Sequence, residues 1–174
     1  MNRSANWHHF PAGPLQNVWL ENGFRLAHDP VWGATIEYDN LPQLSNRLLA
    51  AVLLKSARFD ATEILYLRLK LDLPQSDCAR LLGTGEQTLS LWERGKHPIP
   101  VSSETVLRRL AFEELRGQLP KGFRFPRLID MASNIKTSTA GTYLARYAED
   151  SWFVVHDQPA ARAKNKTQAE PMAA

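Results

Sequence analysis

The segment QSDCARLLGTGEQTLSLWERG, residues 75–95, meets several requirements of two short helices that cross at a steep angle. Ala79 is small at the point where such helices approach each other, and Gly83 can adopt the positive φ that turns the chain between them. Trp92 gives the second helix a large apolar side chain to bury against the first. We therefore predict a helix-turn-helix in this segment.

Helical patterning extends to both sides of this segment, over residues 59–117. Asp60-Ala61-Thr62-Glu63 has the form of a capping box, in which the Asp60 side chain accepts from the Glu63 backbone N–H and the Glu63 side chain reaches back. The remainder is divided into short elements by glycine and proline: Pro74, Gly83, Gly95, Pro98 and Pro100. We predict a bundle of four or five helices over residues 59–117.

The N-terminal part contains a compact strand pattern. Val18–Leu20 and Phe24–Leu26 flank Asn22-Gly23, and an Asn-Gly pair between apolar runs favours a β-hairpin because both residues tolerate positive φ. A third strand is predicted at Ala34–Tyr38, where apolar and polar side chains alternate.

An amphipathic helix is predicted next, from Leu41 to about Lys55, because apolar residues recur there at three- and four-residue spacing. With the strands it would form a small α+β unit of residues 1–58. We expect aromatic side chains to supply the core of this unit rather than a ligand pocket. These are Trp7, Phe10, Trp19 and Trp32.

The helical pattern weakens after the bundle. Residues 118–156 are expected to form a C-terminal extension with short helices at 127–136 and 142–149, and with a strand or an anchoring apolar segment at Trp152–Val155. Residues 157–174 contain almost no large apolar side chains and are predicted to be a disordered tail. The expected fold class is mainly α, a helix-turn-helix bundle with a small N-terminal unit that contains a β-hairpin.

Charge is distributed unevenly along the chain. The net charge is +3, but residues 60–116 carry eight basic and nine acidic side chains, so the surplus lies towards the C-terminus. Arg108 and Arg109 are expected on the charged outer face of a helix that begins near Ser102 or Ser103. If the central segment binds DNA, its basic side chains must be gathered on one face.

Several classes of function are disfavoured by composition. Cys78 is the only cysteine, which excludes an intramolecular disulfide and a zinc site with two thiolates, and suits a reducing cytoplasm. The five histidines lack metal-ligand spacing, and no catalytic glycine-serine or phosphate-binding motif is present. The longest apolar run, Leu48–Leu54, is too short to span a bilayer. We expect a cytoplasmic protein that is not an enzyme, with no membrane association, metal or cofactor.

The central pattern resembles the phage-repressor family of helix-turn-helix domains, the Xre/Cro type, from about Ile64 to Leu110. The resemblance is carried by Leu67-Arg68, Leu71, Leu73-Pro74-Gln75, Ala79, Leu82-Gly83, Thr88-Leu89-Ser90 and Trp92-Glu93-Arg94-Gly95. It implies that Glu86 to Glu93 is a recognition helix in the major groove of DNA. Trp92 and Cys78 are interpreted as core residues.

The resemblance also implies a set of DNA contacts. Base edges would be contacted by Glu86, Gln87, Thr88, Ser90 and Leu91, and the DNA backbone by Gln75, Ser76, Arg94, Lys96 and His97. Glutamine can bind adenine, glutamate can accept from cytosine, and Thr or Leu can contact a thymine methyl. Two residues depart from the family pattern, because Glu86 places a negative charge near phosphates and Leu91 stands where a polar or basic residue is common.

A wider resemblance links the strand-helix-bundle order to regulators related to MqsA-type antitoxins, although the zinc-binding module with paired CxxC motifs is missing here. Together these resemblances imply a sequence-specific, double-stranded DNA-binding transcriptional regulator that acts as a repressor and a homodimer. The alternative is an antitoxin-like or adaptor module that binds a protein partner such as a toxin, with DNA binding secondary.

Overall fold

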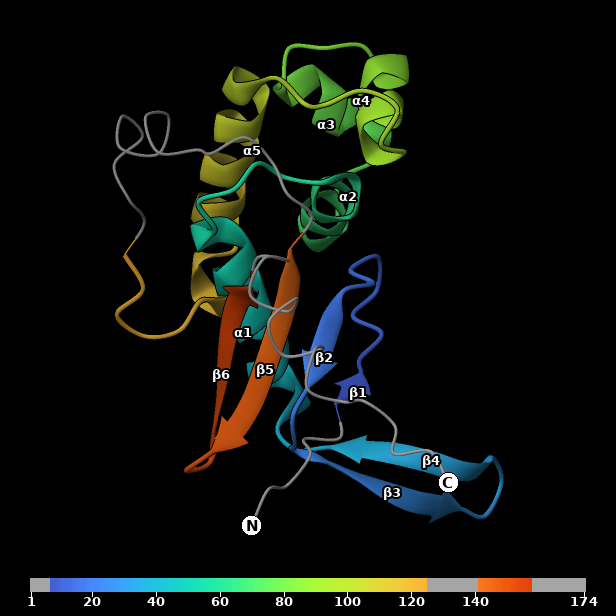
Figure 1. The fold of residues 1–174 in the computed structure, drawn as a ribbon. Coiled ribbons are helices and arrows are strands. Elements are labelled where there is room, and N and C mark those ends of the chain that lie inside the picture. Colours follow the sequence, from blue (N-terminus) through green and yellow to red (C-terminus); the bar gives the residue numbers. More distant parts are fainter. Residues whose placement is uncertain (1–6, 125–140, 158–174) are drawn as a thin grey trace, which may run out of the picture.

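Helices occupy the middle of the chain, and strands precede and follow them (Figure 1). The computed structural model describes residues 7–124 and 141–157. Its helices are α1 (Leu41–Leu54), α2 (Ala61–Lys70), α3 (Gln75–Leu81), α4 (Glu86–Glu93) and α5 (Val101–Glu114), with a 3-10 turn, η1, at Arg116–Gln118. Its strands are β1 (His8–His9), β2 (Val18–Leu20), β3 (Phe24–Asp29), β4 (Gly33–Tyr38), β5 (Thr142–Ala148) and β6 (Ser151–Asp157).

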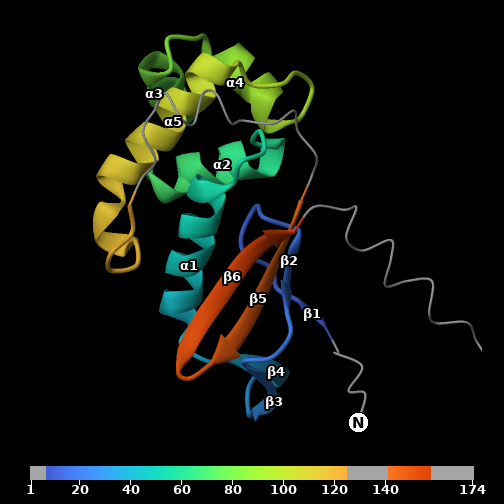
Figure 2. The ribbon, with the colours of Figure 1, turned by 60° about the vertical axis from the view of Figure 1, so that its left-hand side comes forward.

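Four of the strands form one mixed sheet in the order β1-β2-β5-β6. β2 and β5 run parallel, with Val18 opposite Tyr143, and the other two pairs are antiparallel. The inward side chains alternate along the strands, and α1 packs on this sheet beside β6 (Figure 2). The expectation of a mainly α fold is therefore wrong, because a sheet built from both ends of the described chain forms one layer of the core.

β3 and β4 form a separate two-stranded ribbon, and this corrects the predicted hairpin. Phe24 pairs with Tyr38 of β4, so the Ala34–Tyr38 strand is confirmed but is the partner of β3. The Asn-Gly pair serves a different purpose. The Asn22 side chain exchanges hydrogen bonds with the Tyr147 backbone, and Gly23, at φ +75°, lets the chain leave the first sheet.

The segment predicted as a helix at residues 142–149 is strand β5 instead. Its Tyr143 and Ala145 are buried while Arg146 is exposed, an alternation typical of a strand. The alternative of a strand at Trp152–Val155 is confirmed as part of β6. The helix predicted at 127–136 and all but the first residue of the predicted tail lie outside the described residues.

Local sequence rules account well for the helices. Asn40 caps the start of α1, because its side chain accepts from the Gln43 backbone N–H, and the helix ends one residue before the predicted Lys55. The capping box of α2 is confirmed, because Asp60 accepts from the Glu63 backbone N–H and Glu63 accepts from the Asp60 backbone N–H. The expected aromatic core is only partly present, since Phe10 is buried but Trp7 is 37% and Trp32 82% exposed.

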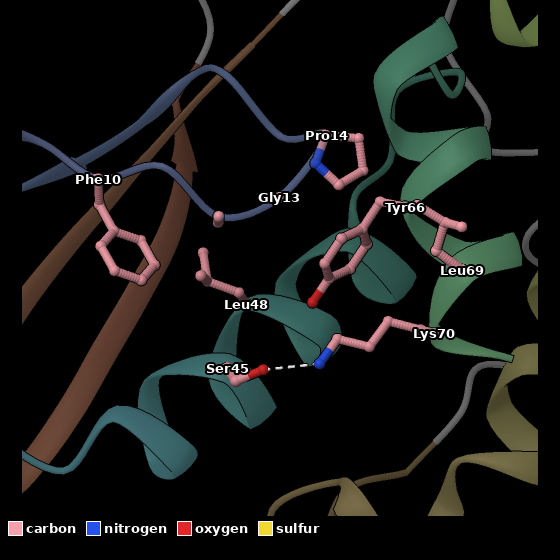
Figure 3. A pocket seen from close by; sticks show the side chains of 9 residues that line it. Phe10, Gly13, Pro14, Ser45, Leu48, Tyr66, Leu69 and Lys70 are labelled. Carbon is pink, nitrogen blue, oxygen red and sulfur yellow. Dashed lines mark hydrogen bonds between the residues drawn. The ribbon is translucent and has the colours of Figure 1, made fainter. Parts of the chain in front are cut away.

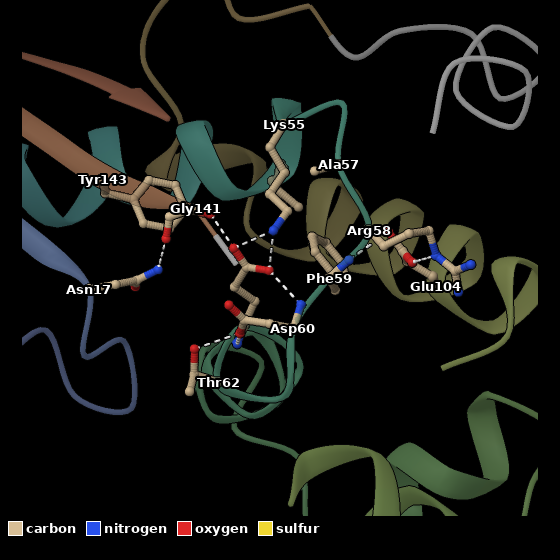
Figure 4. A network of polar contacts seen from close by, with 12 residues as sticks. Asn17, Lys55, Ala57, Arg58, Phe59, Asp60, Thr62, Glu104, Gly141 and Tyr143 are labelled. Atoms are coloured by element: carbon tan, nitrogen blue, oxygen red, sulfur yellow. Dashed lines mark hydrogen bonds and ion pairs between the residues drawn. The ribbon is translucent and has the colours of Figure 1, made fainter. Parts of the chain in front are cut away.

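A buried polar network joins the sheet to the helices (Figure 4). Lys55 and Glu63 form an ion pair with both side chains fully buried, and the Lys55 Nζ lies 2.6 Å from one Glu63 oxygen. The hydroxyl of Tyr143 in β5 donates to the same carboxylate at 2.5 Å. Burial raises the pKa of Glu63 above its usual value, and the Lys55 ammonium offsets part of this increase.

Arg108 lies in this interior, so its expected place on an outer helix face is wrong. Its guanidinium donates to Glu104 and to three backbone carbonyls, of Leu53 in the last turn of α1 and of Lys55 and Ala57 just after it, and it stacks on the Phe59 ring at 3.9 Å. Glu104 also accepts from Arg58. Arg109 is exposed and pairs with Glu113. Because α5 holds the α1–α2 connection through these bonds, the bundle has a fixed position on the sheet.

Candidate nucleic-acid interface

Two helices joined by a tight turn lie where the sequence predicts the helix-turn-helix. α3 ends in a Schellman motif: the Thr84 N–H donates to the Ala79 carbonyl at 2.9 Å, and the Gly83 N–H donates to the Arg80 carbonyl at 3.1 Å. Gly83 has φ +66°, as this motif requires. The left-handed glycine redirects the chain and satisfies two carbonyls at the end of α3.

The same geometry ends the helices on either side of α3. After α4, Gly95 has φ +68° and the Lys96 N–H donates to the Leu91 carbonyl at 2.9 Å. After α2, the left-handed residue is Asp72, at φ 53°, and the Leu73 N–H donates to the Arg68 carbonyl. Three consecutive helices therefore end with the same turn, and this fixes the length and direction of each.

The inner side of the helix pair is apolar. Leu89 and Trp92 of α4 are buried with Cys78 and Ala79 of α3, and α4 also packs on α2. Burial raises the pKa of the Cys78 thiol to about 11, so the thiol stays protonated at neutral pH. Trp92 and Cys78 are core residues, as predicted.

A polar cluster fixes the end of α4 against α2 and α3. Arg68 binds both oxygens of Glu93, with the Nε at 2.5 Å from Oε1, and its Nη1 donates to the Leu73 carbonyl. Gln75 completes the cluster, because its Nε2 donates to Glu93 at 2.7 Å. In the sequence, Arg68 and Glu93 are recognised only as part of the family pattern, with no role of their own. The signal that was available is the position of Glu93: it directly follows the inward Trp92, and a carboxylate so close to the core indicates a basic or hydrogen-bonding partner in the interior.

The outer side of α4 brings most of the predicted contact residues together. Glu86, Gln87 and Thr88 are exposed, and Ser90 and Leu91 are half-buried. An open hollow of about 450 Å³ is lined by Gln75, Glu86, Gln87, Ser90, Leu91 and Arg94. Four of the five predicted base-contact residues and two of the five predicted backbone-contact residues therefore share one surface, which Thr88 does not line.

The remaining predicted backbone contacts lie around this hollow rather than in it. Ser76 is exposed in the first turn of α3, and Lys96 is exposed just after α4. His97 lines a different depression, formed with the start of α2 and the α4–α5 connection. The structure thus separates His97 from the outer side of α4. Arg80, which was not predicted as a contact, is exposed near the end of α3 and pairs with Asp77.

Burial removes three glutamates of the central segment from the surface, together with Arg68 and Arg108, two of its basic side chains. Glu63, Glu93 and Glu104 all pair with basic side chains in the interior or at its edge. Around the hollow, Arg94 and Lys96 are exposed, and Glu86 forms no ion pair with any described residue. Outside these pairs, the eight basic and nine acidic residues of the segment are reduced to six of each, so the segment is neutral in formal charge.

No family model matches the sequence, and no match is found among curated proteins or solved structures. In the part of the chain that the structure describes, no helix is long and apolar enough to cross a membrane. The same residues contain no group of three or more His, Cys, Asp or Glu side chains arranged to hold a metal ion.

Proposed function

We propose that this protein is a cytoplasmic transcriptional repressor that binds specific double-stranded DNA through the outer side of α4. The observation that carries the proposal is the surface formed by Gln75, Glu86, Gln87, Ser90, Leu91 and Arg94, held by the Glu93 cluster and by two Schellman turns. This agrees with the resemblance to Xre/Cro-type domains, in which the second helix of the pair is the recognition helix.

The dimensions of α4 suit the major groove. An α-helix with its side chains is about 10–12 Å in diameter, and the major groove is about 12 Å wide. Gln87 and Leu91 are four residues apart and line the same hollow, so they can reach neighbouring base pairs. Gln87 suits adenine, Glu86 suits the amino group of cytosine, and Leu91 suits a thymine methyl. Arg94, Lys96 and Ser76 would contact phosphates beside the groove.

One module of this size reads only a few base pairs. We therefore propose a homodimer on a pseudo-palindromic site whose half-sites lie about 34 Å apart, one helical turn of DNA. Each subunit would then supply one α4.

Selection from random duplexes, followed by binding measurements at several salt concentrations, tests the proposal. Gln87→Ala should relax the preference at one or two base pairs and cost about 1–3 kcal/mol on the selected site. Lys96→Ala should weaken all duplexes alike and reduce the salt slope by about 1. The exposed residues Gln118 and Lys121 provide matched control variants, Gln118→Ala and Lys121→Ala. Failure to enrich any sequence, or equal effects of Gln87→Ala and Gln118→Ala, would contradict the proposal.

A second candidate function is supported by Glu86 and Leu91. A carboxylate that pairs with no described residue and an apolar side chain on the outer side of α4 also suit a protein partner. In that case the chain is an antitoxin-like or adaptor module that binds a protein such as a toxin. Glu86→Gln separates the two: removing a charge that faces phosphates should strengthen DNA binding, whereas it should weaken binding to a basic protein surface.

A further inference from the structure

A second hollow, of about 470 Å³, lies away from α4, where the β1–β2 connection meets α1 and α2 (Figure 3). Most of its wall is apolar. It is lined by Phe10, Ala12, Gly13, Pro14, Ser45, Leu48, Tyr66, Leu69 and Lys70. No acidic side chain is among them. Its volume falls within the range of about 300–1,000 Å³ that is typical of small-molecule sites.

Two polar groups at one end of this hollow lack suitable partners. Tyr66 is only 5% exposed, and its hydroxyl has no hydrogen-bond partner among the described residues, although the nearby Ser45 offsets part of the rise that burial causes in its pKa. The Lys70 ammonium donates to the Ser45 hydroxyl at 2.7 Å, and it forms no ion pair with any described residue. Figure 3 shows the polar ends of Tyr66 and Lys70 turned towards Ser45.

Both groups are unusual for a folded protein. A buried hydroxyl without an acceptor loses its hydration and gains nothing in return, so most such groups are satisfied. A partly buried ammonium ordinarily has a carboxylate beside it. Burial lowers the pKa of Lys70, in keeping with the missing counter-charge. The other interior lysine, Lys55, does have its carboxylate, Glu63.

One chemical group supplies what both side chains lack. A carboxylate can accept from the Lys70 ammonium with one oxygen and from the Tyr66 hydroxyl with the other. Phe10, Leu48 and Leu69 would then contact an apolar body attached to it. We propose that this hollow binds a small organic carboxylate with an apolar body, with its charge held by Lys70 and Tyr66.

The site is built from three segments that are separate in sequence. Phe10 and Pro14 belong to the β1–β2 connection, Ser45 and Leu48 to α1, and Lys70 to α2. A ligand in the hollow would contact all three segments at once. Its binding requires nothing of the α4 surface, so it can be tested independently of DNA.

The experiment uses the full-length chain and two defined carboxylates, octanoate and 4-phenylbutyrate, with the corresponding uncharged amides as controls. Binding is followed by calorimetry and by backbone amide NMR shifts. We expect a millimolar or tighter Kd for at least one carboxylate, NMR shifts centred on Tyr66 and Lys70, and binding about tenfold or more weaker for its amide. Absence of binding, equal affinity for acid and amide, or shifts centred elsewhere would overturn the proposal.

Variants identify the groups that hold the charge. Lys70→Met should reduce the carboxylate affinity to that of the amide, whereas the exposed Lys121→Met should leave it unchanged. Tyr66→Phe removes one oxygen atom that makes no hydrogen bond to any described residue, so this variant should fold. It therefore tests the site even if Lys70→Met does not fold. It should weaken the carboxylate severalfold and the amide less. Wild-type affinity in a folded Lys70→Met or Tyr66→Phe variant would refute the assigned contacts.

Discussion

Replacing Lys55 with Met tests whether charge, rather than packing, holds the sheet to the helix bundle. The substitution keeps the length of the side chain and removes the ammonium from a pair whose two side chains are fully buried. At the 2.6 Å separation of Nζ and Oε1, the Coulomb attraction is about 6 kcal/mol for an effective dielectric constant of about 20. Desolvation of each ion costs several kcal/mol, so the net contribution of the pair is small.

Removing one partner alone has a larger effect than this net value. Lys55→Met leaves Glu63 buried without its counter-charge, and we expect the free energy of unfolding to fall by about 3–5 kcal/mol at neutral pH. The double variant Lys55→Met/Glu63→Gln has no charge left to desolvate, and its glutamine oxygen can still accept a hydrogen bond from Tyr143 or Asp60. It should therefore be more stable than Lys55→Met alone.

The loss of stability in Lys55→Met should also depend on pH, in a direction set by the Glu63 pKa. The pKa of Glu63 is raised in the folded state, so its protonation stabilises the fold at low pH, and this contribution is lost as the pH rises through the folded-state pKa. Without Lys55 the pKa rises further. The loss in Lys55→Met should therefore be largest at about pH 8 and smaller at about pH 5, and the double variant should lack this dependence.

Urea unfolding followed by tryptophan fluorescence at both pH values measures these changes. Arg25→Met is the matched control, because Arg25 pairs with Glu37 at a similar distance of 2.7 Å but both side chains are more than half exposed. Its cost should stay below about 1 kcal/mol. A pH-independent loss in Lys55→Met, or a double variant less stable than that single variant, would refute a role for charge.

Further predictions compare two tyrosines, Tyr143 and Tyr66, and two glycines, Gly23 and Gly83. Urea unfolding measures the change in the free energy of unfolding for each variant. Tyr143→Phe should lower the free energy of unfolding by about 1.5–3 kcal/mol because its hydroxyl donates to a carboxylate, whereas Tyr66→Phe, which removes a buried hydroxyl without a partner, should raise it by about 1 kcal/mol. Equal losses would contradict the assignment of partners. Gly23→Ala should cost about 2–5 kcal/mol, since its Cβ would lie 2.5 Å from the Trp152 ring at a φ of +75°. Gly83→Ala has a similar φ but meets nothing within 4 Å, so it should cost only about 1 kcal/mol, and a Gly23→Ala cost as low as that of Gly83→Ala would show that the clash with Trp152 is relieved.

Sequence alone predicted the elements whose causes are local. The capping box at Asp60, the turn at Gly83 and the inward Trp92 each depend on residues within a few positions of one another. The outer side of α4 follows from the same periodicity, which is why most of the predicted base contacts share one surface. Helical rules thus described residues 59–117 well.

The errors have non-local causes. An Asn-Gly pair suits a hairpin turn and also a point where the chain leaves a sheet. The second outcome is decided by distant contacts, those of Asn22 with Tyr147 and of Gly23 with Trp152. Arg108 looked like a surface residue because most of its acceptors are backbone carbonyls at the C-terminal end of α1 and just after it, and backbone carbonyls carry no sequence pattern. The site at Tyr66 and Lys70 was missed for a similar reason, since its walls come from three separate segments.

The parallel pairing of β2 with β5 has a consequence for synthesis on the ribosome. Val18 lies opposite Tyr143, so β2 stays without its partner strand while 125 further residues are synthesised. This takes about 6–25 s at the usual elongation rates of about 5–20 residues per second. The contacts among α2, α3 and α4 are local and can form during that interval. Until β5 emerges, Val18 and Leu20 present an unpaired apolar edge, which is the state of the nascent chain most exposed to aggregation and to chaperones.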